Sequence, residues 1–169
     1  DDEKIFDAEV IKVEKKDGIF YHTIKVLSNE IHKGEEVLLA VDPEKRNAAA
    51  RNHTATHILQ AALREVLGSH IEQAGSYVSK DRLRFDFTHF EALTAKELIE
   101  VQNLVNKKIL EAIPVTTREM PIEEAKKLGA MALFGEKYGD VVRVVSAGDF
   151  SVEFCGGTKE KKNANPRLF

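Results

Sequence analysis

The segment that most constrains the fold is a long helical pattern in the first half of the chain. It begins near Pro43 or Asn47 and runs to Leu67, and Gly68 is placed to cap its end. Asp42-Pro43 marks a boundary, because a residue before proline is biased away from the helical region. The apolar residues of the pattern are Ile58, Leu59, Ala62, Leu63 and Val66. The chain therefore divides into a segment before this helix and a segment after it.

Short alternating segments before the helix predict a small β unit. Polar and apolar residues alternate over 7–14 and again over 19–26, and the KKDG sequence between them favours a turn. A second turn at 33–35 precedes the apolar sequence VLLAV, which we predict to be a further strand. Three or four short strands are few for a closed barrel. We therefore expect residues 1–42 to form a partial β-barrel.

The elements that follow the long helix begin with strands and a second helix. Residues 69–90 read as strands, and LRFDF within them alternates as a strand with one buried face does. Thr94 and Glu97 form a capping box that opens a helix running to about Ile113. The predicted buried face of that helix comprises Leu98, Val101, Val105 and Ile109.

A third helix and a pair of strands complete the predicted order. Pro121 opens the helix, which ends at Gly129, and residues 130–140 are expected to form a loop. VVRVV and FSVEF then predict two strands joined by a turn at 146–149. The predicted fold class is α+β: a small partial β-barrel followed, at 43–158, by a helix-flanked antiparallel-sheet core.

Two histidines, His53 and His57, stand four residues apart in the long helix, within the sequence RNHTATHILQ. Side chains at this spacing lie one above the other. At 100° per residue, the apolar stripe centres opposite the pair, so the histidines point toward solvent or toward a second wall that closes a cleft. Two imidazoles at this spacing can ligate one zinc ion, although the same spacing also arises where no metal binds.

Cys155 is the only cysteine in the sequence and offers a third ligand for such a site. It lies in FCGGT, beside two glycines at the end of a predicted strand, where the backbone can bend sharply and a thiolate can face a cleft. The alternative is that it is a small buried apolar residue. A single cysteine excludes an internal disulfide, and we expect a cytoplasmic location.

Composition narrows the classes of partner. No apolar run approaches the roughly 18 residues that a membrane span needs, so we expect no membrane contact. The net charge is −3, so any contact with nucleic-acid phosphates must come from local patches. The oligomeric state stays open, because the strand edges of an incomplete barrel could pair with a second copy.

Six sequence blocks occur in an order that resembles one known family. They are HTATHILQAAL, IEQAGSYV, LRFDFTHF, ALFGEKYGD, VRVV and FCGGT, within roughly residues 40–158. Together they resemble the editing domain of alanyl-tRNA synthetases, and they are similar to the free-standing alanyl-tRNA editing proteins. The FGEKYGD block looks more like the synthetases. Residues 1–41 are similar to part of the barrel that precedes the editing core, which implies a fragment of a longer protein.

The resemblance implies an activity, a cofactor and a partner. The family hydrolyses the ester of tRNA(Ala) mischarged with serine or glycine and leaves alanyl-tRNA intact, so the implied partner is the acceptor end of tRNA(Ala). The matching positions make His53, His57 and Cys155 ligands of a zinc ion, with Cys155 at the catalytic centre. Gln73 matches the catalytic-site glutamine that reads the serine hydroxyl. Further candidates for the substrate pocket are Thr54, Ser76, Gly156 and Gly157.

The match ends at Lys159. The family motif CGGTH closes with a histidine that completes the zinc site, and Lys159 stands at that position here. A protonated lysine cannot ligate zinc, because its lone pair is occupied. We expect either an open coordination position or weaker zinc binding. Residues 159–169 are charged and aperiodic, match nothing in the family, and are predicted to be a disordered tail.

The chemistry expected of this site is hydrolysis of an activated ester. The sequence has no G-x-S-x-G and no evident nucleophile–base pair, so we expect no covalent intermediate. Zinc would either lower the pKa of a bound water and polarise the ester, or hold the amino group of the substrate. Two alternatives remain: a metal-depleted tRNA-binding module of the same fold with little activity, and an unrelated zinc hydrolase with a small substrate.

Overall fold

The structure is a computed structural model that describes residues 6–131, 138–157 and 159. The chain falls into two compact units, which divide between Ala40 and Val41. Within the described residues, helices and antiparallel strands occur together and no closed barrel forms, so the α+β class is confirmed. None of the described helices combines the length and the apolar character that crossing a membrane requires.

The first unit is built on one antiparallel hairpin, β1 (Asp7–Lys16) and β2 (Ile19–Ser28). Two residues, Asp17 and Gly18, join the strands with φ angles of 51° and 82°. Positive φ at both positions is what a tight hairpin turn requires, and Asp-Gly is a preferred sequence for it. The predicted strands and turn are therefore confirmed, and both strands extend beyond the predicted ends.

The strand predicted for VLLAV is wrong for this structure. Residues 37–41 are not in a strand, and Leu38 is 94% exposed. A strand exists only where its backbone groups bond to a neighbouring strand, and the described residues provide no such neighbour for this segment. Apolar composition alone therefore misled the prediction, and the described part of the expected partial barrel is a hairpin followed by a long loop.

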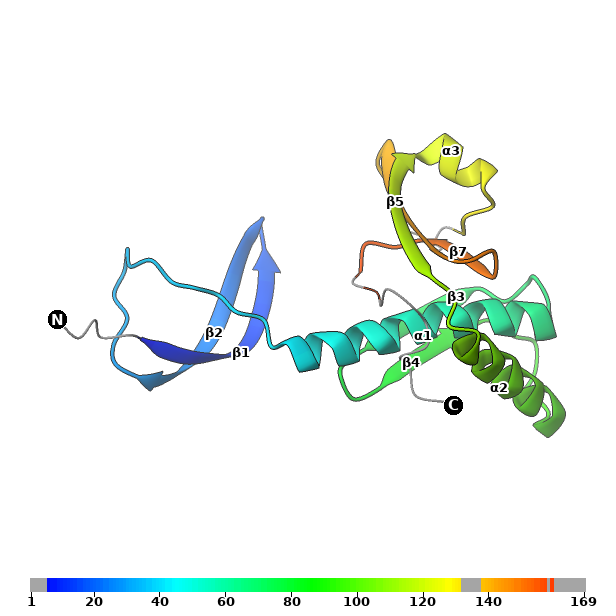
Figure 1. Ribbon diagram of the computed structural model, residues 1–169, viewed down its shortest axis with the longest axis horizontal. Helices are drawn as coiled ribbons and strands as arrows, with labels where there is room; N and C mark the ends of the chain where they lie inside the picture. Colours follow the sequence, from blue (N-terminus) through cyan, green and yellow to red (C-terminus); the bar gives the residue numbers. More distant parts are fainter. Residues whose placement is uncertain (1–5, 132–137, 158, 160–169) are drawn as a thin grey trace. The chain divides into compact units, whose positions relative to one another are not determined.

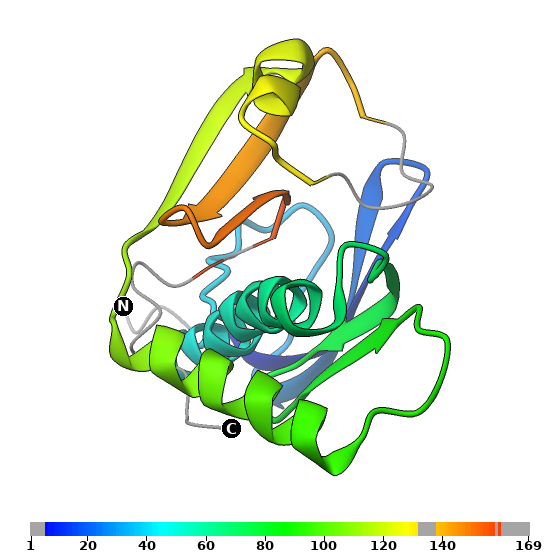
Figure 2. The same ribbon diagram turned by 90° about the vertical axis from the view of Figure 1, so that its right-hand side faces the viewer.

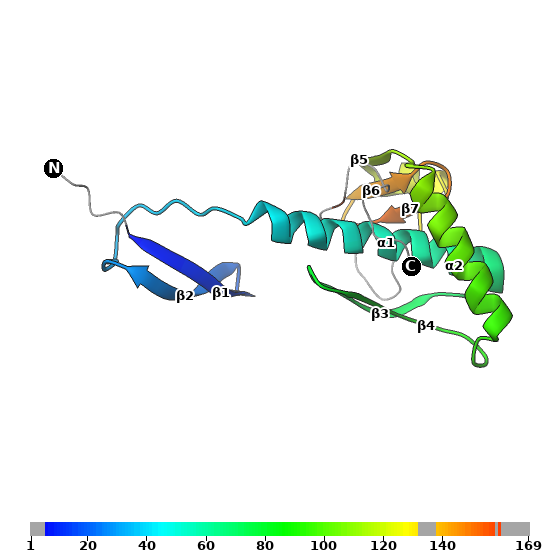
Figure 3. The same cartoon turned by 60° about the horizontal axis from the view of Figure 1, so that its bottom comes forward.

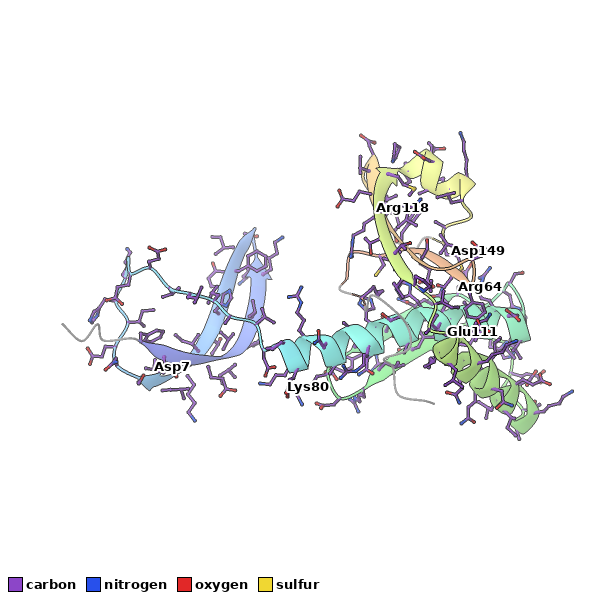
Figure 4. All side chains as sticks on the ribbon, in the orientation of Figure 1. Asp7, Arg64, Lys80, Glu111, Arg118 and Asp149 are labelled. Atoms are coloured by element: carbon purple, nitrogen blue, oxygen red, sulfur yellow. The ribbon has the colours of Figure 1, made fainter. Side chains whose placement is uncertain are left out.

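The long helix α1 (Pro43–Leu67) opens the second unit as predicted. Asp42 caps it, because its Oδ1 accepts hydrogen bonds from the backbone N–H groups of Glu44 and Lys45 at 2.9 and 3.1 Å. Gly68 ends it with a φ of 118°, which favours glycine. Arg64 lies in the last turn of the helix (Figure 4), and its Nη1 donates to the carbonyl oxygen of Ile71 at 2.6 Å. The turn that leads out of α1 is thereby fixed.

Two antiparallel sheets lie on either side of α1, as Figure 3 shows. One sheet pairs two strands, and the other has three strands in the order β5-β6-β7. Figure 2 looks along α1 and shows α2 beside it. The remaining elements are β3 (Gln73–Val78), β4 (Leu83–Phe87), α2 (Ala95–Leu110), β5 (Val115–Pro121), α3 (Ile122–Lys127), β6 (Val141–Ala147) and β7 (Ser151–Phe154).

The main core forms between α1 and α2. Its buried residues are Ile58, Ala62, Leu63, Ile71, Val101, Val105, Ile109 and Ala147. The capping box of α2 is present as predicted, with the Thr94 hydroxyl accepting from the backbone N–H of Glu97. Leu98 was expected on the buried face but is 55% exposed. It lies in the first turn of α2, outside the core cluster to which the later turns of the helix contribute. The apolar stripe of the sequence therefore extends beyond the part of α2 that packs against the core.

The sequence prediction missed β5. Its sequence, VTTREMP, carries few apolar residues, and most of its side chains are exposed. It lies at one edge of its sheet. Backbone pairing with β6, from Val115 opposite Ala147 to Pro121 opposite Val141, defines it instead. Most of the loop predicted for 130–140 lies outside the described residues. Met131, at its start, forms an isolated bridge with Glu153.

Candidate metal centre

The fold brings together the three predicted ligands from distant parts of the sequence. His53 and His57 project from α1, and Cys155 directly follows β7, which runs beside α1 (Figure 1). One ligand atom from each residue lies within 4.8 Å of the other two. His53 Nε2 is 3.5 Å from Cys155 Sγ, and the two imidazole centroids are 5.6 Å apart. This is a compact donor set for one metal ion.

His57 points into the protein and not toward solvent. The residue is 7% exposed, and the second wall that the helical pattern allowed is formed by β7. Glu153, on that strand, is 4% exposed and places Oε2 2.9 Å from His57 Nδ1, although the geometry lies outside that of a hydrogen bond. Because Nδ1 faces Glu153, Nε2 is the nitrogen of His57 that can ligate a metal.

The Glu153 carboxylate also controls the charge of His57. Burial is the largest influence and would lower the pKa of the imidazole, but the negative charge of Glu153, together with interactions with Cys155 and Glu153, outweighs it and raises that pKa above its ordinary value. The Ser151 hydroxyl donates to Glu153 Oε1 at 3.0 Å and so holds the carboxylate in place. A carboxylate behind a ligating histidine fixes the orientation of the ring. Glu153 is thus part of the site, and sequence analysis missed it.

The loop that carries Cys155 is anchored to β6 by Arg143. The guanidinium Nη1 donates to the carbonyl oxygens of Cys155 and Gly157 at 3.0 and 2.6 Å. The backbone N–H of Cys155 donates a hydrogen bond to the carbonyl oxygen of Arg143 at 3.0 Å. These bonds hold the loop against β6 and so position the cysteine just beyond the end of β7.

Lys159 occupies the place next to the cysteine. Its Nζ donates to Cys155 Sγ at 3.0 Å. Burial would raise the pKa of the thiol, but hydrogen bonds from His53, His57 and Lys159 outweigh it and lower that pKa to about 4. Burial in turn lowers the pKa of Lys159 to about 8, against the attraction of the thiolate. Near pH 7 the site therefore holds a thiolate opposite an ammonium group.

This thiolate predicts a flat pH dependence of alkylation. With a pKa of about 4, Cys155 is ionised above pH 5, so its reaction rate with iodoacetamide should change less than about twofold between pH 6 and 8.5. The reaction rate of an ordinary thiol, with a pKa of about 8.5, would be more than about 100-fold higher at pH 8.5 than at pH 6. The rate is measured by mass spectrometry in the presence of a chelator. A rate that rises tenfold per pH unit would contradict the ionised state.

A small cavity of about 50 Å³ adjoins the ligand group, large enough to admit a water molecule or an ion. Gln73 and Ser76, from β3, line it together with the three ligands. The structure therefore brings Gln73 and Ser76, two of the predicted substrate-pocket residues, to the candidate metal centre. The residues that line the cavity are His53, Thr56, His57, Gln73, Ser76, Glu153, Phe154 and Cys155.

Thr54 is a predicted pocket residue that the structure does not place on this cavity. It is 1% exposed and is not among the lining residues, whereas Thr56 is. Positions 54 and 56 each lie about 80° from the direction midway between His53 and His57, on opposite sides of it, so helical spacing does not choose between them. The Thr56 hydroxyl donates to the carbonyl oxygen of Asn52 at 2.9 Å. Only the fold therefore distinguishes Thr56 from Thr54.

The two glycines after Cys155 have different surroundings, and neither lines the cavity. A side-chain carbon at Gly157 would overlap the His53 ring, whereas one at Gly156 would meet nothing within 4 Å. Gly157 is therefore required for the close approach of the loop to α1. The remaining predictions for 159–169 lie outside the described residues, apart from Lys159.

No family model matches the chain. Individual known proteins, however, are similar to it over most of its length. The chain is 58% identical over 142 residues to an alanine–tRNA ligase of Acetivibrio thermocellus, which is 84% of this chain and 16% of the relative. It is 57% identical over 157 residues to alanine–tRNA ligase 1 of Lachnoclostridium phytofermentans, and the match covers 93% of this chain and 18% of the relative. A Thermotoga maritima alanine–tRNA ligase is 53% identical over 156 residues, covering 92% and 18%.

These similarities place the chain among the aminoacyl-tRNA ligases. More specifically, it belongs to the alanine–tRNA ligase family, whose members are also called alanyl-tRNA synthetases. The chain spans less than a fifth of the length of the curated relatives it matches. The family resemblance expected from the sequence blocks is confirmed.

The donor set fits the zinc ion that the resemblance implies. Two imidazoles and a thiolate suit Zn²⁺, and three protein ligands leave a coordination position open. Among the described residues near these ligands, Lys159 does not fit, because its ammonium carries positive charge to the thiolate.

Proposed function

We propose that this chain is the editing domain of an alanine–tRNA ligase and that it hydrolyses the ester of seryl-tRNA(Ala) or glycyl-tRNA(Ala). The observation that carries the proposal is the shared cavity. Gln73, the predicted reader of the serine hydroxyl, lines the same small space as His53, His57 and Cys155. The acceptor end of tRNA(Ala) is the proposed partner. Residues 43–158 are the proposed editing core, and they follow the proposed partial barrel, residues 1–42, in the sequence. A cytoplasmic location is part of the same proposal.

The residues of the cavity would each have a distinct part in the hydrolysis. A water molecule attacks the carbonyl carbon of the ester, the bond to the ribose oxygen breaks, and the tRNA leaves with a free hydroxyl. His53, His57 and Cys155 would hold a zinc ion, which supplies a Lewis acid for a water or an anchor for the substrate's amino group. Glu153 would keep the His57 ring oriented through the close approach of its carboxylate to Nδ1.

Selectivity against alanine would rest on Gln73 and Ser76. Alanine is smaller than serine, so size alone cannot exclude it. A site whose polar groups are satisfied only by the substrate hydroxyl rejects an analogue that lacks this group by up to about 10⁴-fold or more. Gln73 is half-buried at the start of β3, and its amide offers both a donor and an acceptor.

Gln73→Ala is therefore expected to allow hydrolysis of alanyl-tRNA(Ala). The variant should hydrolyse alanyl-tRNA(Ala) at least about tenfold faster than the unchanged chain, because the polar group that only a serine hydroxyl satisfies is gone. Deacylation of alanyl- and seryl-tRNA(Ala) is measured side by side, with Tyr77→Ala on the same strand as an exposed control. Unchanged rejection of alanine would show that another group reads the hydroxyl.

The proposal itself is tested on the unchanged chain. Release of serine from seryl-tRNA(Ala), with alanyl-tRNA(Ala) stable under the same conditions, is the expected result. One observation favours a second function, a tRNA-binding module with little activity: Lys159 bonds to the thiolate that would hold the metal. That function predicts tRNA binding without deacylation, even after zinc is added. An assay of binding and hydrolysis on one preparation distinguishes the two.

A further inference from the structure

We infer that Lys159 is an internal competitor of the metal: its ammonium group binds the cysteine ligand in the place of a cation, and zinc binds only after this side chain has been displaced. The inference concerns the metal centre of the proposed function, and it does not depend on whether that centre hydrolyses an ester. It goes beyond the loss of a fourth ligand, because it makes the lysine an active opponent of metal binding.

The first support is the direct contact. Lys159 Nζ lies 3.0 Å from Cys155 Sγ and donates a hydrogen bond to it. The sulfur is also 3.5 Å from His53 Nε2. A metal bound by these ligands must sit between them and take up a sulfur lone pair. The hydrogen bond from Lys159 therefore has to be broken or redirected when the metal arrives.

The second support is the charge of the site. Cys155 and Glu153 are the two acidic groups of the described site, and the Lys159 ammonium is attracted by both. It thus provides the positive charge that a divalent metal would otherwise supply. Zinc–thiolate bonds are about 2.3 Å long, so a bound Zn²⁺ would lie within about 5 Å of an undisplaced ammonium group. Two cations at that distance in a half-buried site repel each other strongly.

The third support is the setting of the two groups. The loop that carries Cys155 is held in place by the Arg143 bonds, so a movement of this loop cannot separate Cys155 from Lys159. Lys159 is half-buried, and its long side chain has several rotatable bonds. The lysine is therefore the partner that moves. Displacement of Lys159 into solvent would lose the contact with the thiolate and leave the three ligands as they stand.

Three substitutions of Lys159 in the full chain test this inference, with zinc affinity measured by competition against a chromophoric chelator at one fixed pH. Lys159→Leu removes the charge and offers no ligand, so zinc should bind at least about tenfold tighter than to the unchanged chain. Lys159→Arg keeps the positive charge and should stay within about threefold of the unchanged chain. Lys159→His removes the charge and adds a ligand, so it should bind zinc tightest of the four.

The outcomes separate this inference from the proposed function. If Lys159→Leu binds zinc no tighter than the unchanged chain while all four proteins bind it, the competition is overturned and the metal centre stands. If none of the four binds zinc, Lys159→His included, both the competition and the metal centre are overturned. Thermal unfolding in the presence of a chelator confirms that each variant is folded before its affinity is compared.

Discussion

Replacement of Cys155 by alanine is expected to abolish both zinc binding and hydrolysis of seryl-tRNA(Ala). The thiolate is the ligand that joins the β7 side of the site to the histidines of α1, and the sequence contains no other cysteine. Loss of a group that merely orients a ligand typically costs 10–100-fold in metal affinity, so loss of a ligand itself should cost more than about 100-fold. Zinc per chain is measured by elemental analysis of protein purified without chelator.

The fold should survive this substitution, which makes the result interpretable. Cys155 is half-buried at the end of β7 and does not belong to either core cluster. Its loop keeps the Arg143 bonds to backbone oxygens, which the side chain does not contribute. With both proteins free of metal, we therefore expect a change of less than about 1 kcal/mol in the free energy of unfolding, as is usual away from the core. A Cys155→Ala variant that retains full deacylation would exclude Cys155 from the site.

Gly157→Ala is expected to damage the site through its geometry and not through its ligands. The added carbon would overlap the His53 ring, so either the ring or the loop has to move. Such overpacking typically costs about 1–3 kcal/mol of stability. Because His53 and Cys155 would no longer converge, zinc affinity should fall at least about tenfold. Chelator competition and thermal unfolding measure the two effects.

Gly156→Ala is the matched control for this prediction. The neighbouring position lies in the same loop, but its added carbon meets nothing within 4 Å. Zinc affinity should therefore stay within about twofold of the unchanged chain. Equal losses in both glycine variants would indicate a general effect on the loop and would contradict the specific contact with His53.

The parts of the fold that were predicted correctly have local signals. The boundary at Asp42-Pro43, the terminating Gly68 and the capping box at Thr94 mark helix ends through features within a few residues, and the structure contains all three. The Asp17-Gly18 turn is of the same kind. Such signals act in the same way whatever the rest of the chain does, and for that reason the sequence is sufficient to locate them.

The parts that were missed depend on partners far away in the chain. Strand β5 is defined by its pairing with β6, and VLLAV is not a strand because the described residues leave it without a neighbour. Glu153 reads as an ordinary exposed acid in an alternating strand, yet it is buried because His57 and Ser151 lie opposite its carboxylate. Lys159 was recognised as a departure from the family, but its bond to Cys155 required the fold.

The candidate ligands are far apart in the chain: His53 and Cys155 are separated by 102 positions. Whatever binds both of them closes a loop that contains most of the second unit. Loop-closure entropy grows with the logarithm of loop length, so the unfolded chain seldom brings these ligands together and a metal binds the folded state in preference. A metal at this position would therefore act as a reversible staple between the first helix and the last strand. Its occupancy should be readable as a rise in melting temperature with metal concentration, even in a preparation that contains no tRNA.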